Sequence, residues 1–274
     1  MLSDFLRRVW PAACADLSRL RGPGYRGASA LSVVRPGRAE PSPFCRMSRR
    51  FTTPAGLECD LDYFLEWRPY LWRRPVLWAV GDPAWLGGRR VLEIGCRYGR
   101  MSCLFGLMGA EVLGVDVDAA AIPRAMREVE RWQVGDRVTI RQISGDLAVL
   151  RPQTFDLIFT KSVLYWVREL DAMLDSIDAL LADGGRVAFV ENWRGADWMM
   201  ALRRRLLHRR WMKEAADFPG IRASQLPLFA ERFERFEHRR YWHLVIAMRG
   251  RKRSPAISGQ PATDHSGPLR STGL

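Results

Sequence analysis

The sequence predicts an α/β protein whose helices cover both faces of a doubly wound, mostly parallel sheet of seven strands with an antiparallel last strand. Two observations carry this prediction. Between about residues 57 and 248, short β-branched runs alternate with longer stretches of helical period, a pattern typical of βαβ units. Near the carboxyl end, FERFEHRR and WHLVIAM follow each other too closely for a crossover helix, so they predict an antiparallel pair.

The individual elements follow from the apolar runs and from the turn residues between them. We expect strands at Arg90 to Ile94, Glu111 to Val115, Arg137 to Ile143, Phe155 to Thr160 and Arg186 to Glu191, and the antiparallel pair within Arg232 to Arg249. We expect helices at about Arg100 to Met108, Ala119 to Trp132, Leu170 to Ala182 and Trp198 to Ala216. Asp183-Gly184-Gly185 is expected to end the third helix as a glycine C-cap.

The formal charge of +13 on 274 residues raises the question of a nucleic-acid partner. Residues 1–50 carry ten Lys and Arg against three acids, and residues 249–274 carry five against one. Both stretches are rich in Pro and Gly, so we expect 1–50 and 250–274 to be disordered tails around a domain spanning 57–248. With most of the excess charge in the tails, the distribution argues against a nucleic-acid partner.

The first fifty residues and the cysteines bear on processing and compartment. Either Met47 is the biological start, with a translated extension upstream, or the Arg-rich, acid-poor stretch is a transit peptide. No apolar run approaches the roughly 20 residues that a membrane-spanning helix needs. The sequence has five cysteines, Cys14, Cys45, Cys59, Cys96 and Cys103, and none forms the C-x2-C pair of a metal or redox motif. This usage favours a reducing, cytoplasmic setting.

The segment VLEIGCRYGRMS, Val91 to Ser102, places a strand, a glycine-containing turn and a helix in immediate succession. In a Rossmann-like arrangement such a turn lets a ligand approach the backbone and meet the helix N-terminus. Asp116 ends the next strand, where a carboxylate can accept both hydroxyls of a ribose. The pyrophosphate-binding pattern G-x-G-x-x-G is missing, and the carboxylate of Glu93 suits a ligand with an ammonium group better than a phosphate.

VLEIGCRYG resembles the first motif, [DE]-x-G-x-G-x-G, of class I S-adenosylmethionine-dependent methyltransferases, and the small-molecule, type 11-like members in particular. Glu93, Gly95 and Gly99 match the motif, whereas Arg97 stands at its central glycine. The resemblance implies a Rossmann-like fold, S-adenosyl-L-methionine as cofactor and methyl transfer as the activity. Arg97 either points outward or pairs with the methionine carboxylate, or it obstructs the turn and leaves a non-catalytic binding or scaffold protein.

The resemblance also implies roles for residues at the following strand ends. Asp116 would bind the ribose with Val117 against the adenine, and Asp146 in SGDL would lie near the adenine amino group. The alternative for Asp146 is a purely structural capping acid. FDLIFTKSVLYWV would turn its backbone toward the methionine part. The implied cofactor-binding set is Glu93, Gly95, Arg97, Gly99, Asp116, Val117, Asp146, Leu147, Thr160 and Lys161.

Methyl transfer from a sulfonium is downhill, so the protein needs mainly to hold donor and nucleophile in line in a dry site. If the acceptor is a hydroxyl, a base must take its proton. Candidates near the expected mouth of the site, each of which can equally be structural, are Tyr165, Glu191, His208, His238 and His243.

Thr160-Lys161-Ser162-Val163 stands where amino-methylating members of the family carry an Asn-Pro-Pro-Tyr-like motif, which implies a small-molecule acceptor with an oxygen or carbon nucleophile. The alternative is an RNA methyltransferase that uses its basic tails. The aromatic-rich stretch 62–78 either walls an apolar acceptor pocket or packs on the sheet, as part of a helical lid spanning 57–88. A basic amphipathic helix at 199–213 either covers the site, contacts an anionic membrane surface, or is simply solvated on its charged face. The expected small-molecule acceptor is apolar or anionic.

Overall fold

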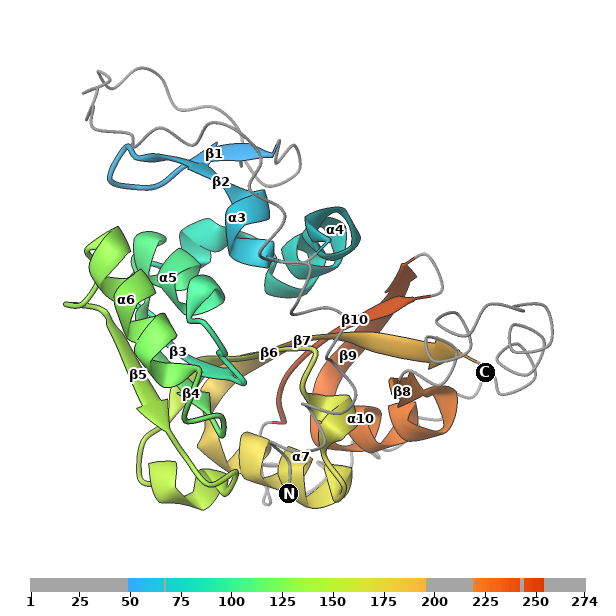
Figure 1. Cartoon of the computed structure of the whole chain (residues 1–274). Coiled ribbons are helices and arrows are strands. Elements are labelled where there is room, and N and C mark those ends of the chain that lie inside the picture. Colours follow the sequence, from blue (N-terminus) through green and yellow to red (C-terminus); the bar gives the residue numbers. More distant parts are fainter. Residues whose placement is uncertain (1–48, 67, 196–218, 242–243, 254–274) are drawn as a thin grey trace, which may run out of the picture.

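The computed structural model of the chain describes residues 49–66, 68–195, 219–241 and 244–253 (Figure 1). The two expected tails, the helix expected at Trp198 to Ala216, and two of the candidate bases, His208 and His243, lie outside these residues. Within them, no helix combines the length and the apolar character needed to cross a membrane.

The main sheet follows the order β5-β4-β3-β6-β7-β10-β9, and the short β8 pairs with β7 beside this path. Its strands are β3 (Arg90–Ile94), β4 (Glu111–Asp116), β5 (Val138–Gln142), β6 (Phe155–Lys161), β7 (Leu181–Gly195), β8 (Ile221–Arg222), β9 (Phe233–Tyr241) and β10 (Val245–Lys252). Neighbours from β5 to β7 are parallel, whereas β10 runs antiparallel to both β7 and β9. The predicted doubly wound sheet with an antiparallel last strand is confirmed.

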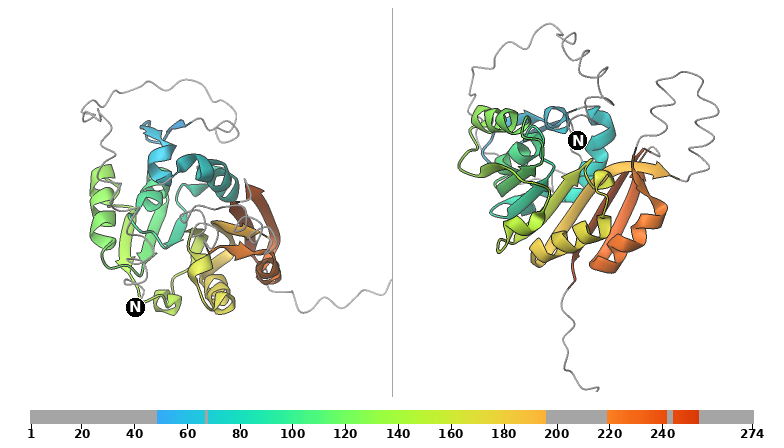
Figure 2. Two further views of the ribbon diagram at one scale, coloured as in Figure 1. Left: turned by 45° about the vertical axis from the view of Figure 1, so that its right-hand side comes forward. Right: turned by 60° about the horizontal axis from the view of Figure 1, so that its bottom comes forward.

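Helices cover both faces of this sheet, and the two views of Figure 2 show the same layering. The helices are α3 (Leu61–Leu65), α4 (Pro69–Val80), α5 (Arg100–Leu107), α6 (Ile122–Trp132), α7 (Leu170–Leu180) and α10 (Leu226–Arg232), with 3-10 turns η2 (Pro83–Leu86), η3 (Leu147–Leu150), η4 (Leu164–Trp166) and η5 (Ala223–Gln225). Successive side chains of a strand point to opposite faces of the sheet, so the hydrophobic core consists of two clusters, one on each face. Val91 and Leu157 pack toward α4 and α5, whereas Leu92 and Ile158 pack toward α7 and α10.

The strands β3 and β6 lie side by side in the middle of the sheet. From β3 the chain proceeds to β4 and β5 on one side, and from β6 it proceeds to β7 on the other, so the strand order reverses between β3 and β6. In open α/β sheets a ligand binds in the crevice at the carboxyl ends of the strands beside such a reversal. The loops after β3, β4 and β6 therefore define the region in which to look for the site. The residues that the sequence assigns to a cofactor follow these strands.

The segment before β3 forms a two-stranded hairpin, β1 (Arg50–Thr52) and β2 (Glu58–Asp60), followed by α3 and α4. Phe64 and Trp72 are buried and belong to the core under α4 and α5. Of the two alternatives for the aromatic-rich stretch, packing on the sheet is therefore the one that holds for these two side chains. Tyr70, by contrast, stays 63% exposed.

The structure corrects two expectations about boundaries. The third helix ends at Leu180, and Leu181 is already extended and opposite Phe155 of β6, so Gly184 (φ +71°) lies in an irregular part of β7 instead of capping the helix. A pairing partner on β6 is available at Leu181, and strand pairing therefore begins before the glycines. In addition, β10 runs to Lys252, so Arg251 and Lys252 lie in the sheet and not in the tail expected from residue 250.

Candidate functional site

The turn between β3 and α5 has three residues in the left-handed backbone region: Gly95 (φ +76°), Arg97 (φ +48°) and Gly99 (φ +72°). Two of them leave no room for a side chain. A Cβ on Gly95 would lie 2.3 Å from Cγ2 of Val163, and one on Gly99 would lie 3.0 Å from Cβ of Ala125. The turn therefore requires glycine at these two positions, on packing as well as conformational grounds.

Arg97 adopts the backbone conformation of the glycine it replaces, so the turn forms in spite of the substitution. Its N–H donates to Oδ2 of Asp116 at 2.7 Å, which ties the turn to the end of β4. Its guanidinium carbon lies 4.6 Å from the ring centroid of Tyr98, and that of Arg124 lies 5.2 Å from the same ring. A residue with a Cβ pays about 1 kcal/mol for this conformation.

The end of β4 presents a carboxylate and an apolar side chain side by side. Asp116 accepts from the N–H groups of Arg97 and Asp118, one on each oxygen, and each carboxylate oxygen keeps a further acceptor site. Val117 is 48% exposed, and a Cβ on Gly145 would lie 3.6 Å from its Cγ1. The ends of β4 and β5 thus meet around an exposed aliphatic surface.

Asp146 follows Gly145 and caps η3. Its Oδ1 accepts from the N–H of Ala148 at 2.8 Å, while the residue is exposed and Leu147 beside it is buried. An open hollow lined by Gly145, Asp146 and residues of α7 borders this turn. Asp146 therefore has the structural capping role that the sequence left as an alternative, and it also faces an accessible space.

Glu93 is buried, with 3% of its surface exposed, and accepts from the hydroxyl of Ser102 on α5. Burial raises the pKa of Glu93 to about 8, and the hydrogen bond from Ser102 and the charge of Lys161 only partly oppose this. At neutral pH its carboxyl is mostly protonated. An ammonium group placed beside it would favour the ionised form.

The end of β6 is fixed by a second buried carboxylate. Oε1 of Glu191 accepts from the hydroxyl of Thr160 at 2.7 Å, and Oε2 accepts from the N–H groups of Val163 and Leu164 at 2.8 and 3.1 Å. Both Thr160 and Glu191 have 0% exposure, and burial raises the pKa of Glu191 to about 7. Glu191 thus anchors β6 and the following loop to β7, and its contacts are those of a structural residue.

Lys161 brings the N-terminal segment to the same strand end. Its Nζ lies 5.2 Å from the ring centroid of Trp72 and 3.4 Å from the carbonyl oxygen of Leu65. Burial lowers the pKa of Lys161, although the negative charges of Glu66 and Glu93 act in the opposite direction. Lys161 was expected to contribute its backbone to the site. Its side chain also connects β6 to α3 and α4.

A second set of contacts holds α3 against α5 and α6, and sequence reasoning missed it. Arg100 donates to the carbonyl of Tyr63 at 3.0 Å, and its Nε lies 3.7 Å from Glu66. The hydroxyl of Tyr63 donates to Glu128, and the guanidinium of Arg131 donates to that hydroxyl at 3.1 Å. The two partners of each of these contacts are far apart in the sequence, so no spacing rule signals them.

The remaining candidate bases occupy different places. Tyr165 in η4 follows the β6 loop and is half-buried, and burial raises its pKa above the usual range. His238 is exposed on β9, opposite Met248 of β10, and β7 and β10 separate it from β6. The structure brings Tyr165 to the loop next to the site and leaves His238 away from it.

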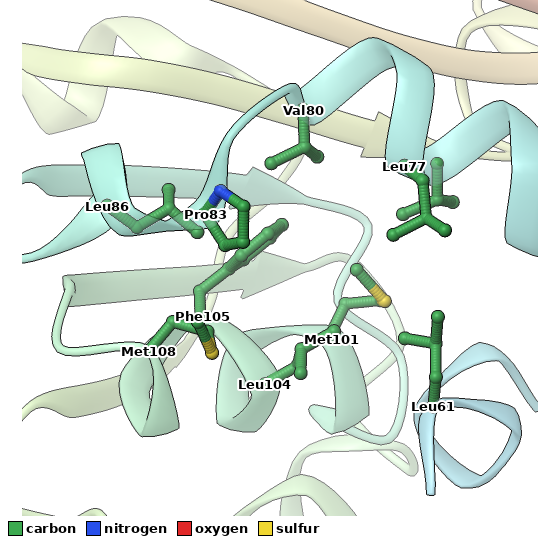
Figure 3. A pocket seen from close by; sticks show the side chains of 10 residues that line it. Leu61, Leu77, Val80, Pro83, Leu86, Met101, Leu104, Phe105 and Met108 are labelled. Atoms are coloured by element: carbon green, nitrogen blue, oxygen red, sulfur yellow. The ribbon is translucent and has the colours of Figure 1, made fainter. Parts of the chain in front are cut away.

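An apolar cavity of about 20 Å³ lies between α4, η2 and α5 (Figure 3). Val80, Leu86, Met101 and Phe105 are among the side chains that line it. This volume holds about one water molecule, and apolar cavities of that kind stay dry. The cavity is a packing gap under α4 and is too small for an acceptor.

Residues 92–187 match the family model of a methyltransferase domain. Ubiquinone biosynthesis O-methyltransferase of Pseudomonas syringae pv. tomato is 32% identical over 111 residues, which cover 40% of this chain and 47% of that protein. Ribosomal RNA small subunit methyltransferase C of Chromohalobacter salexigens is 30% identical over 119 residues, 42% of this chain and 34% of that protein. The chain thus spans about half, or less, of the length of these relatives.

Two solved structures have the same fold. N-methyltransferase NodS of Bradyrhizobium japonicum, in complex with S-adenosyl-L-homocysteine, has a TM-score of 0.50 and 20% identity, covering 72% of this chain and 94% of that chain. The YcgJ protein of Bacillus subtilis has a TM-score of 0.51 and 15% identity, covering 62% of this chain and 94% of that chain. The likeness extends beyond the segment that the family model matches.

Proposed function

We propose that this chain, whose residues 92–187 match the family model of a methyltransferase domain, is a class I methyltransferase that binds S-adenosyl-L-methionine and transfers its methyl group to a small-molecule acceptor. The observation that carries the proposal is the surface at the ends of β4 and β5. There an exposed Val117 lies between the carboxylate of Asp116 and the turn at Gly145. An adenosine needs such a pairing of an apolar face with acceptors for its ribose hydroxyls.

In this proposal each residue has a distinct part in binding. Asp116 accepts from the ribose hydroxyls with the lone pairs that its two backbone contacts leave, and Val117 packs on the adenine. The second oxygen of Asp146 accepts from the adenine amino group. Leu147 supports that turn from the core. The turn from Gly95 to Gly99 and the backbone at Thr160 and Lys161 lie against the methionine part, and Glu93 ionises beside its ammonium group.

The cofactor supplies a methyl group on a sulfonium, and the protein's contribution is alignment and exclusion of water. Glu191 fixes the loop at Val163 and Leu164, and this anchoring supports a rigid wall on the acceptor side. The partly buried ammonium group of Lys161, 5.2 Å from the ring centroid of Trp72, supports a site that excludes water. Tyr165 stays a candidate for contact with an acceptor hydroxyl.

A small-molecule acceptor with an oxygen or carbon nucleophile is supported by the Thr160-Lys161-Ser162-Val163 sequence after β6 and by the similarity to an O-methyltransferase of ubiquinone biosynthesis. An apolar or anionic acceptor is compatible with a site beside Trp72 and Lys161. The buried free thiols of Cys59, Cys96 and Cys103 are compatible with the cytoplasmic setting that we also propose.

Calorimetry with S-adenosylmethionine tests the binding step, and the chain offers a matched control. Asp146 caps η3 through Ala148, and Asp82 caps η2 in the same way through the N–H of Ala84, away from the proposed site. We expect micromolar affinity for wild type, a loss of about 1 kcal/mol for Asp146→Ala, and unchanged affinity for Asp82→Ala. Absence of binding by wild type would overturn the proposed function, and equal effects of both variants would remove Asp146 from the site.

A cofactor carrying a radiolabelled methyl group tests the acceptor class. The enzyme is incubated in parallel with a protein-free small-molecule extract and with purified total RNA. We expect label in compounds that stay soluble after acid precipitation. Label confined to the RNA would replace the proposed acceptor by the alternative that the sequence left open.

A further inference from the structure

Trp78 in α4 is flanked by two arginines from the neighbouring strands. The guanidinium carbon of Arg249 on β10 lies 4.5 Å from its ring centroid, and that of Arg239 on β9 lies 5.0 Å away. Arg249 also forms an ion pair of 2.6 Å with Glu237, whereas Arg239 is exposed. The ring thus holds two guanidinium groups at the surface of the sheet.

Trp85 in η2 is the centre of a second such group. The guanidinium carbon of Arg186 on β7 lies 4.1 Å from its ring centroid, and that of Arg89 lies 5.2 Å away. Arg251 of β10 stands directly opposite Arg186 in the strand register. Directly opposed residues of an antiparallel pair are close neighbours, so two positive charges meet at this position.

These groups lie on one side of the sheet. Gly250 separates Arg249 from Arg251, and a Cβ on it would meet Phe233 of the core under α7 and α10. Both arginines therefore point to the opposite side, where α4 packs on β10 (Figure 1). We call the surface formed by Arg89, Arg186, Arg239, Arg249 and Arg251 with Trp78 and Trp85 the Arg–Trp face.

Among the described residues, the five arginines of the Arg–Trp face outnumber the three carboxylates that pair with them or stand opposite them. In the described part of the chain, the carboxylates that pair with these arginines or stand opposite them are Glu237, Asp156, which lies 3.8 Å from Arg89, and Glu234, opposite Arg251 in the register. Arg186 is half-buried, and its pKa is lowered by burial and by the charges of Arg251 and other arginines. Like charges directly opposite each other destabilise a sheet, and a bound polyanion would offset that cost.

The nature of the polyanion follows from what surrounds these charges. Insertion into a bilayer needs exposed apolar side chains. The large apolar side chains that are exposed in the described part of the chain, such as Tyr70, Met126 and Leu244, do not belong to this face. Planar guanidinium groups held on rings fit phosphodiester oxygens. Trp78 and Trp85 already stack on arginines, so phosphates and not bases would be bound.

We propose that the Arg–Trp face binds the phosphate backbone of an RNA strand without regard to its sequence. The sequence argued against this partner because most of the excess positive charge was counted in the two tails, and the charges of Arg249 and Arg251 were part of that count. The proposal goes beyond the proposed function and does not depend on it, because its residues lie outside the cofactor-binding set.

A salt titration with the full-length protein and a fluorescein-labelled single-stranded RNA of 20 nucleotides tests the proposal. Arg186→Gln combined with Arg251→Gln removes the opposed pair. The control combines Arg127→Gln on α6 with Arg137→Gln before β5, which removes the same charge elsewhere. Each neutralised phosphate contributes about −0.7 to the slope of log affinity against log salt. We expect the first variant to bind about tenfold more weakly at 50 mM salt, with a slope shallower by about 1.4.

The control variant should lose less than about threefold in affinity. Arg239→Gln, which changes only an exposed side chain, should weaken RNA binding by a few fold, and this keeps the test valid if the double variant fails to fold. Equal losses in the control and the double variant would overturn the proposal. It would also fail if the double variant bound RNA as wild type does but lost affinity for vesicles of phosphatidylcholine with one quarter phosphatidylserine, because the face would then recognise a membrane.

Discussion

Arg97 shows how a glycine position in a cofactor turn can accept a side chain. The backbone takes the left-handed conformation, and the N–H donates to the carboxylate of Asp116. The conformational cost of about 1 kcal/mol is of the size of one hydrogen bond, and the contact with Asp116 is charge-assisted. The turn can therefore form without the central glycine of the family motif.

The first prediction concerns the substitution Arg97→Gly. Relief of backbone strain and the greater freedom of glycine in the unfolded chain have opposite signs and similar size, so the free energy of unfolding should change by less than about 1 kcal/mol. S-adenosylmethionine should bind the variant no more tightly than wild type in calorimetry. A gain of tenfold or more, about 1.4 kcal/mol, would mean that the arginine side chain obstructs the site.

A second residue has a directly measurable share in binding. Asp116→Ala should weaken S-adenosylmethionine binding by about 1.5 to 3 kcal/mol, because charge-assisted hydrogen bonds to the ribose are lost. Asp118→Ala, which removes a cap from Ala120 two residues further on, is the control for a disturbed loop. If both variants lost the same affinity, the ribose assignment would be wrong and the effect would belong to the loop.

At the scale of elements, Glu191 joins three pieces of structure that the sequence presents separately. It is buried on β7, and its oxygens accept from Thr160 at the end of β6, from Val163, which precedes η4, and from Leu164, the first residue of η4. Removal of a buried carboxylate that accepts from backbone N–H groups lowers stability strongly, because it leaves these donors buried without an acceptor.

Substitution of Glu191 should therefore act on stability before it acts on turnover. Glu191→Ala should lower the free energy of unfolding by about 2 to 4 kcal/mol in urea, and Thr160→Val, which removes one of its three donors, by about 1 kcal/mol. Glu191→Gln should lie between the two. If Glu191→Gln instead retained full stability and abolished methyl transfer, Glu191 would be a catalytic base and not an anchor.

The elements that could be predicted from the sequence are those whose signal is local. The strands β3, β4 and β6 were predicted to within a residue at each end, because strands buried on both faces are continuous apolar runs. The end of α7 was not predicted correctly. It is determined by the pairing of Leu181 with β6, whereas the sequence signal was the pair of glycines that follows. The contact of Lys161 with Trp72 depends on how α4 packs, which no local pattern specifies.

For the molecule as a whole, the two buried carboxyls make stability depend on pH. Glu93 has an ordinary pKa of 4.5 that burial raises to about 8, and Glu191 rises to about 7. Between the ordinary pKa of 4.5 and the raised pKa of each residue, the carboxyl group is ionised in the unfolded chain but still protonated in the folded protein. Stability should therefore fall as the pH rises from about 4.5 toward 8, opposite to the behaviour of ion-paired carboxylates.

The variant Glu93→Gln should remove part of this dependence. Between pH 6 and pH 8.5 the melting temperature of wild type should fall by about 2 to 6 °C more than that of the variant, which corresponds to about 1 to 2 kcal/mol. Glu58→Gln, at an exposed position on β2, should follow wild type. Parallel curves for wild type and Glu93→Gln would show that the carboxyl is ionised throughout.

The distribution of charge is the feature of the whole molecule that the sequence represented least well. Counting charges by segment assigned Arg249 and Arg251 to a tail, because the apolar run ends at Met248. Pairing with β7 continues the strand through Arg251, and this brings it opposite Arg186. Such an encounter between distant residues depends on register, which the amino-acid pattern constrains only where one face is clearly apolar.

The position of β10 between β7 and β9 also fixes an order of events during synthesis. About fifty residues separate Gly195 from Val245, and a ribosome adding roughly 5 to 20 residues per second needs about 2 to 10 s to supply them. Throughout that interval β7 exposes an apolar edge that later becomes the interior of the sheet. The nascent chain is then open to wrong pairing at this edge. A chaperone that shields nascent strands would therefore be needed most while residues 196–244 emerge.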